Sequence, residues 1–108
     1  MSLTPEEIET WREQNEPECA VYFVAVRGFI KIGWSENWKA RIKHIQVNNP
    51  EEIEVLLVIG RPKIFEQTMH ADFAAFRARG EWFHDCPEIR AYIEGRKDEC
   101  WYRAGRLK

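Results

Sequence analysis

The sequence predicts a small α/β domain of the α+β type, in which strands alternate with helices. The chain has 108 residues, which is enough for one hydrophobic core and not for two. With 44% hydrophobic and 13% aromatic residues, its composition is that of a folded domain and not of a disordered chain. Three runs rich in β-branched and aromatic residues, at 20–27, 29–34 and 53–59, alternate with stretches of helical periodicity. The expected order is helix, strand, strand, helix, strand, helix, short strand, helix.

The first helix is expected close to the N-terminus. Thr4 is suited to cap it, Pro5 to fill the first helical position and Glu7 to complete a capping box. The helix is expected to end near residue 15, because Pro17 cannot continue it.

The first two strand runs are expected to form a hairpin with a tight turn at Arg27 and Gly28. A two-residue turn places Tyr22 opposite Gly33 and makes Lys31 a diagonal neighbour of Tyr22 on the same face. Because Gly33 has no side chain, it leaves space above the phenol. The register therefore predicts a place where a phenol and an ammonium group can meet a phosphate.

Local signals also bound the later elements. Ser35 is expected to cap the second helix, and Gly80 is expected to end the third. A short extended segment follows at 81–83, and Pro87 begins the last helix. The second, third and fourth helices are expected at residues 36–47, 62–79 and 87–101.

Charge is distributed unevenly along a chain whose net charge is −2. Residues 1–18 carry a net charge of −5, whereas residues 19–50 carry +4. This basic segment is either a solvated helix face or a site for phosphate, and charge alone does not decide between them. A further hypothesis is that the acidic N-terminal helix folds over the basic segment and competes with DNA. The basic segment contains Arg27, Lys31, Lys39, Arg41 and Lys43.

Cysteine usage and hydropathy bear on localisation. Cys19, Cys86 and Cys100 are odd in number and widely spaced, which favours reduced thiols in a cytoplasm over a disulfide framework. No run of about 18 apolar residues predicts a membrane helix, and the acidic N-terminus is unlike a secretory signal. We expect a cytoplasmic protein that does not associate with membranes.

Several short motifs occur in order along most of the chain, from about residue 20 to 93. They are Val21-Tyr22-Phe23, Lys31-Ile32-Gly33, Arg41, Asn49-Pro50, Glu66 with His70, and Gly80-Glu81-Trp82-Phe83. Together they resemble the GIY-YIG endonuclease superfamily, in particular its phage-borne and bacterial branch. The resemblance implies a central three-stranded antiparallel sheet flanked by helices. It also implies a nuclease domain at 19–94, between an acidic helical extension at 1–18 and a helix end with a basic tail at 95–108.

The resemblance implies cleavage of DNA with one divalent metal ion, Mg²⁺ or Mn²⁺. Tyr22 would orient or deprotonate the attacking water, Arg41 would steady the phosphate and Glu66 would hold the metal ion. Lys31 stands where many members have a second tyrosine, and we expect its charge to lower the pKa of Tyr22. His70 completes the expected catalytic set and would bond Glu66 or contact substrate.

Other residues enter the expected site without a defined chemical role. Gly33 and Glu81 belong to the motifs. Trp34 is expected to stack on bases, whereas Trp38 lies on the apolar stripe of its helix and is expected in the core. The full set of expected DNA contacts is Arg27, Trp34, Lys39, Lys43, His44 and Arg77.

Two alternatives are open: the same fold could bind nucleic acid without catalysis, or it could bind a protein through its acidic helix. His84 and Cys86 are too isolated to favour a zinc site, and no cysteine has the surroundings of a nucleophile. Because so short a chain has little room for a targeting domain, either its specificity for DNA is low, or a protein partner or self-association supplies it.

Overall fold

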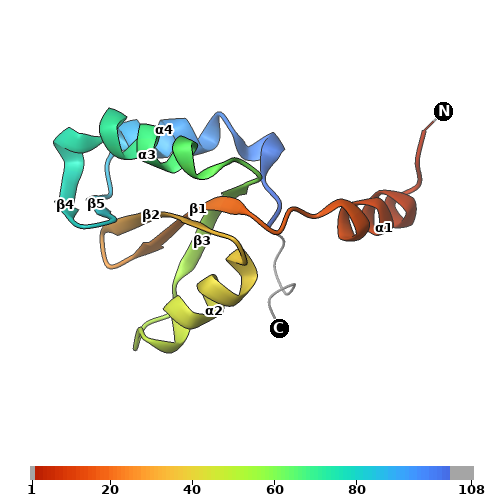
Figure 1. Cartoon of the computed structure of the whole chain (residues 1–108), viewed down its shortest axis with the longest axis horizontal. Coiled ribbons are helices and arrows are strands. Elements are labelled where there is room, and N and C mark those ends of the chain that lie inside the picture. Colours follow the sequence, from red (N-terminus) through yellow and green to blue (C-terminus); the bar gives the residue numbers. More distant parts are fainter. Residues whose placement is uncertain (1, 103–108) are drawn as a thin grey trace.

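A five-stranded antiparallel sheet organises residues 2–102, the part of the chain that the computed structural model describes (Figure 1). The strand order is β3-β1-β2-β5-β4. The α+β class is confirmed, but the expected three strands are too few. The strands are β1 (Ala20–Val26), β2 (Phe29–Ser35), β3 (Glu54–Ile59), β4 (Arg77–Arg79) and β5 (Trp82–His84).

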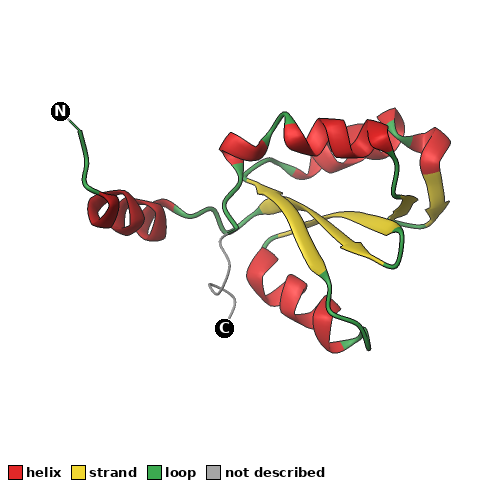
Figure 2. Ribbon diagram, turned by 180° about the vertical axis from the view of Figure 1, so that it is seen from behind, coloured by secondary structure: helices red, strands yellow, loops and turns green. Residues whose placement is uncertain are grey.

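Helices cover the two faces of the sheet unequally (Figures 1 and 2). Two helices, α3 (Lys63–Asp72) and α4 (Pro87–Glu94), lie on one face. A single helix, α2 (Trp38–Val47), packs on the other face, against side chains of β1 and β3. The central strand β1 is therefore buried from both sides.

The first helix, α1 (Pro5–Asn15), extends away from this layered body and buries no residue (Figures 1 and 2). Its expected capping box is confirmed, because Thr4 and Glu7 exchange side-chain to backbone hydrogen bonds. Trp11 stacks on Trp101 with ring centroids 6.2 Å apart, so the helix is held from one side. No described helix is long and apolar enough to cross a membrane.

The tight turn between β1 and β2 is confirmed. Arg27 and Gly28 both have positive φ, +53° and +81°, which is the geometry of a two-residue hairpin turn that matches the strand twist. The turn sets the expected register, in which Tyr22 pairs with Gly33 and Val24 pairs with Lys31.

The third helix is shorter than its apolar spacing predicts. It ends at Asp72, and a 3₁₀ turn (Ala74–Phe76) leads into β4. Phe73 and Phe76 still pack against the core, because a 3₁₀ turn also places residues three apart on one side. Gly80, with φ +57°, forms the β4–β5 turn instead of ending the helix.

The bounds of the second and fourth helices also differ from those expected. Asn37, and not Ser35, caps α2 by accepting a hydrogen bond from the backbone of Ala40. The last helix ends at Glu94 because the following chain returns to β3, where Trp101 N donates to Val58 O at 2.8 Å. The basic residues expected beyond this point, Arg103, Arg106 and Lys108, lie outside the described residues.

Candidate active site

The candidate site lies where one edge of β2 is left uncovered. β5 pairs with β2 only from Phe29 to Lys31, so within the described residues the end of β2 has no neighbouring strand on that side. The last contact with this segment is a hydrogen bond from Ile32 N to Glu81 O at 3.0 Å. Side chains from α2, α3 and the segment before β5 can therefore approach the same stretch of β2.

Tyr22 reaches this edge from the neighbouring strand. It is 1% exposed, and its ring lies directly over Gly33. A Cβ atom at Gly33 would lie 2.8 Å from Cε1 of the ring and closer still to Cζ and Oη. Glycine is therefore needed at this position, since any side chain would occupy the space that the phenol fills.

Three charged groups act on the phenol. Burial is the main reason that the pKa of Tyr22 is raised to about 12, and the carboxylates of Glu81 and Glu66 raise it further. The guanidinium of Arg41 opposes them. Four of the expected site residues are thus brought together, and the phenol is protonated at neutral pH.

The expected effect of Lys31 on Tyr22 is wrong. Lys31 Nζ lies 3.1 Å from Glu81 Oε1 and 5.3 Å from the ring centroid of Trp82. Its charge is therefore partly neutralised by Glu81, and the pKa of Tyr22 is raised and not lowered. The role of Glu81 could not be predicted from the sequence, because nothing local indicates that its carboxylate pairs with Lys31 and acts on the phenol.

Glu66 lies on α3, and 8% of the residue's surface is exposed. Within the described residues it forms no hydrogen bond and no ion pair. A carboxylate without a counter-charge among the described residues is available to a bound cation. No group of three or more His, Cys, Asp or Glu side chains that could hold a metal ion occurs among residues 2–102. A magnesium ion here would rely on one carboxylate, water and substrate, which is common for Mg²⁺.

Arg41 is the cation of the site that is available to a ligand. It is exposed on α2 and forms no ion pair with any described residue. Three other bases of the basic segment are paired: Arg27 with Glu51 at 2.8 Å, Lys31 with Glu81, and Lys39 with Glu16 at 2.6 Å. Fewer unpaired cations are therefore available to a phosphate than the net charge of +4 in this segment suggests.

His70 has a different partner from the one expected. Its Nε2 lies 2.7 Å from Ile32 O, and its Nδ1 lies 3.3 Å from Nη2 of Arg77. A carbonyl only accepts and a guanidinium only donates, so Nε2 of His70 donates to Ile32 O and its Nδ1 can accept from Arg77. It bonds the free edge of β2 and not Glu66, which makes it a residue that positions the edge.

The expected DNA contacts are only partly available. Trp34 is half-buried against the core, with Lys63 Nζ 5.9 Å from its ring centroid, and Arg77 lies over Phe83 at 5.5 Å. Trp38 is in the core, as expected. Of the remaining expected contacts, Lys43 and His44 are exposed on α2.

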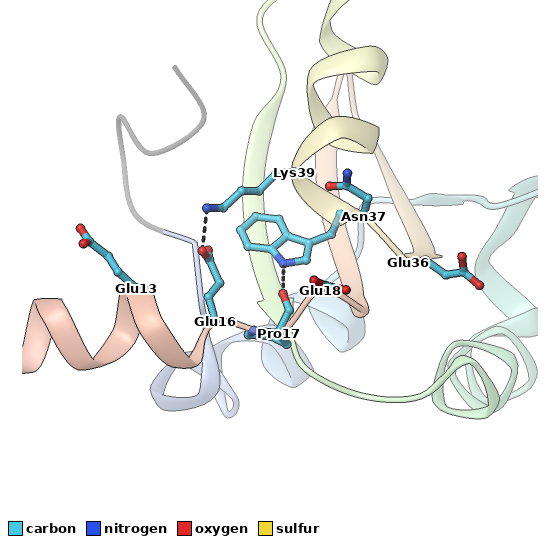
Figure 3. A pocket seen from close by; sticks show the side chains of 8 residues that line it. Glu13, Glu16, Pro17, Glu18, Glu36, Asn37 and Lys39 are labelled. Atoms are coloured by element: carbon cyan, nitrogen blue, oxygen red, sulfur yellow. Dashed lines mark hydrogen bonds and ion pairs between the residues drawn. The ribbon is translucent and has the colours of Figure 1, made fainter.

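A cavity of about 540 Å³ lies away from this site, between the segment after α1 and the start of α2 (Figure 3). Glu16 pairs there with Lys39, and Trp38 Nε1 donates to Pro17 O at 2.8 Å. Its other carboxylates, Glu13, Glu18 and Glu36, would repel a polyanion. The N-terminal segment meets the basic segment through Glu16 while α1 extends away, so the expected covering of that segment by α1 is not observed.

The comparison with protein families assigns the chain. The model of the T5orf172 domain matches residues 9–98, which include every residue of the candidate site. The chain belongs to the T5orf172 domain family. The expected membership of the GIY-YIG superfamily is therefore corrected, because the match is to a distinct family.

The T5orf172 domain is a phage-associated domain of nuclease-like or DNA-binding character. No curated protein and no solved structure matches the chain. Within this T5orf172 domain, the roles of Tyr22, Arg41 and Glu66 must be argued from their geometry and chemistry.

Proposed function

We propose that this T5orf172 domain is a metal-dependent nuclease that hydrolyses phosphodiester bonds in DNA. The observation that carries the proposal is that the charges of Arg41, Glu66 and Glu81 all act on the phenol of Tyr22, beside the open edge of β2. Hydrolysis of a phosphodiester needs an oriented water and positive charge near the phosphate oxygens. A phenol, a free guanidinium and an unpaired carboxylate are suited to these tasks.

Each side chain has a proposed role that follows from its state. The neutral phenol of Tyr22 donates a hydrogen bond to the phosphate or to the attacking water. Arg41 offers two parallel N–H groups to phosphate oxygens. Glu66 would hold Mg²⁺ or Mn²⁺, which when bound lowers the pKa of water and offsets charge on the phosphate.

His70 and Lys31 act on the site indirectly in this proposal. His70 keeps the free edge of β2 in place through the carbonyl of Ile32. Lys31 holds Glu81 beside the phenol through its ion pair. Both are therefore positioning residues.

A plasmid-nicking assay tests the proposal. We expect the protein to nick supercoiled DNA with Mg²⁺ or Mn²⁺ and to stop when EDTA is added. Glu66→Gln and Arg41→Ala should each slow nicking by about 100-fold or more, the usual cost of losing one transition-state contact. Glu88→Gln and Lys97→Gln, which are exposed charge changes on α4 and after it, should nick like the wild type.

Equal nicking with and without EDTA, or undiminished nicking by Glu66→Gln, would contradict the proposal. A second candidate function is DNA binding without cleavage, favoured by the lack of a three-ligand metal group among the described residues. That candidate predicts that the protein shifts DNA and that neither metal ions nor Glu66→Gln change the shift.

The organisation of the chain is also a proposal. We place the nuclease core at residues 19–94, with residues 1–18 and 95–108 as extensions, in a cytoplasm that keeps the thiols reduced. Cys19, Cys86 and Cys100 are free in the structure, which is consistent with that compartment. A protein partner or self-association would then supply specificity for particular DNA.

A further inference from the structure

Among the described residues, no helix packs on the part of one sheet face that β2 and β5 form near the hairpin turn. On the side of α2, the register directs Phe29, Lys31, Trp82 and His84 outward from β2 and β5. The helix α2 packs on β1 and β3, and these four residues do not belong to the core cluster that it forms with those strands. Phe29 is 38% exposed and Trp82 is half-buried. An aromatic surface is therefore open to ligands beside the candidate active site.

A groove runs along this surface between the hairpin turn and β4. Its volume is about 320 Å³, at the lower end of the range for small-ligand pockets. Its lining is apolar and includes two arginines. Arg79 is exposed and forms no ion pair with a described residue, whereas Arg27 is paired with Glu51. The groove is lined by Val26, Arg27, Phe29, Ala78, Arg79 and Trp82.

The groove adjoins the candidate active site. Lys31 Nζ lies 5.3 Å from the ring centroid of Trp82 and 3.1 Å from Glu81 Oε1. Glu81 in turn is the charge that acts most strongly on the phenol of Tyr22. A ligand that filled the groove would thus lie next to a phosphate at Tyr22, on the same face of the sheet.

We propose that the groove binds unpaired bases of single-stranded DNA, so that the substrate of this domain carries a single-stranded segment. The inference rests on the proposed function, because the same strand would cross the site at Tyr22. Aromatic rings stack on bases of any sequence, and a free arginine beside them suits the phosphates. Bases within a duplex are already stacked on each other and cannot lie on Phe29 or Trp82.

Charge complementarity favours this occupant over a protein. A partner protein that inserted an apolar side chain would contact only the apolar walls of the groove and would need no cation beside it. Two exposed cations on this side of the sheet, Arg79 in the lining of the groove and Arg41 on α2, form no ion pair with a described residue and instead match a polyanion. The arrangement of stacking rings and cations is the one by which proteins hold single strands.

The test is a binding measurement in EDTA, where metal-dependent cleavage cannot occur. Fluorescence anisotropy would compare a labelled oligo-dT strand of about 15 nucleotides with a duplex of about the same length. We expect the full chain to bind the single strand about tenfold more tightly than the duplex. Phe29→Thr should weaken single-strand binding about tenfold and duplex binding less than twofold, since one stacked base is lost.

Arg79→Gln should weaken single-strand binding. It should also reduce the slope of log K against log salt concentration by about one, the value for one lost phosphate contact. Ile64→Ala and Lys97→Gln are matched controls, because they remove an exposed apolar group and an exposed cation elsewhere. Phe29→Leu keeps the apolar area and removes the aromatic ring, so it serves if Phe29→Thr fails to fold. We expect it to lose single-strand binding to a similar degree.

Equal affinity of the wild type for both DNAs, or unchanged binding by a folded Phe29 variant, would overturn the inference. The inference would also be overturned if the sole effect of Phe29→Leu were a loss of self-association, measured by light scattering. The two proposals fail separately. A protein that binds single strands as described but never nicks DNA refutes the nuclease, whereas one that nicks duplex DNA independently of Phe29 refutes the groove.

Discussion

The phenol of Tyr22 lies on the backbone of Gly33, its cross-strand partner, in the space that a side chain would occupy. The contact has two consequences. It lets a residue of the buried central strand reach a site at the open edge of β2. It also makes the position of the hydroxyl group depend on the absence of one methyl group.

Replacing Gly33 by alanine is therefore expected to displace the phenol. The added Cβ would overlap the ring, and we expect the free energy of unfolding to fall by about 1–3 kcal/mol, as for other overpacked sites. Urea denaturation measures the change. Gly95→Ala is the control, because its Cβ would meet the nearest atom, Ala91 O, at an ordinary 3.5 Å.

A double-mutant cycle identifies the ring as the cause. In a Tyr22→Ala background the overlap is absent, so Gly33→Ala should cost much less there than in the wild type. An equal cost in both backgrounds would show that Gly33 is needed for another reason.

The titration of Tyr22 should appear in stability at high pH. Its pKa is raised to about 12 by burial, whereas in the unfolded chain a tyrosine ionises near pH 10. This stabilising contribution is complete below pH 10 and is lost as the pH rises to 12, by about 2–3 kcal/mol. Between pH 10 and 12 the urea midpoint of the wild type should therefore fall relative to that of Tyr22→Phe, because the two proteins share every other titrating group.

The pH dependence of nicking tests the state of the same phenol. If the protonated phenol donates a hydrogen bond, the ratio of wild-type to Tyr22→Phe activity should stay constant from pH 7 to about 10. A ratio that rises about tenfold per pH unit would instead show that the phenolate takes a proton from water.

His70 is expected to act through the strand edge that it holds. His70→Ala should lower the free energy of unfolding by about 1–3 kcal/mol, because Ile32 O loses its donor. His70→Gln can place an amide N–H in the same position and should restore most of the loss. Loss of nicking by a stable His70→Gln would mean that the imidazole itself contacts substrate.

The ion pair between Glu16 and Lys39 should reduce affinity for DNA. Glu16→Gln releases the cation of Lys39, and we expect duplex DNA to bind about twofold more tightly at low salt. The gain should vanish at high salt. Glu13→Gln lines the same cavity and forms no ion pair with a described residue, so an equal gain there would indicate a general charge effect.

Features that depend on neighbouring residues could be predicted from the sequence. The turn at Arg27 and Gly28 sets the register of the hairpin, and the register alone places Tyr22 opposite Gly33. The capping box of Thr4 is equally local. Such features follow from backbone geometry over a few residues, which is why they could be predicted.

The contacts between distant residues around the sheet depend on how the helices and strands pack together, and they could not be predicted from the sequence. The pairing of β4 with β5 ends α3 early, which no local signal predicts. Lys31 meets Glu81 and not the phenol, and His70 meets a backbone carbonyl. Each of these contacts joins residues that are far apart in the sequence. The protonation of Tyr22 depends mainly on burial, which is a property of the whole packed domain.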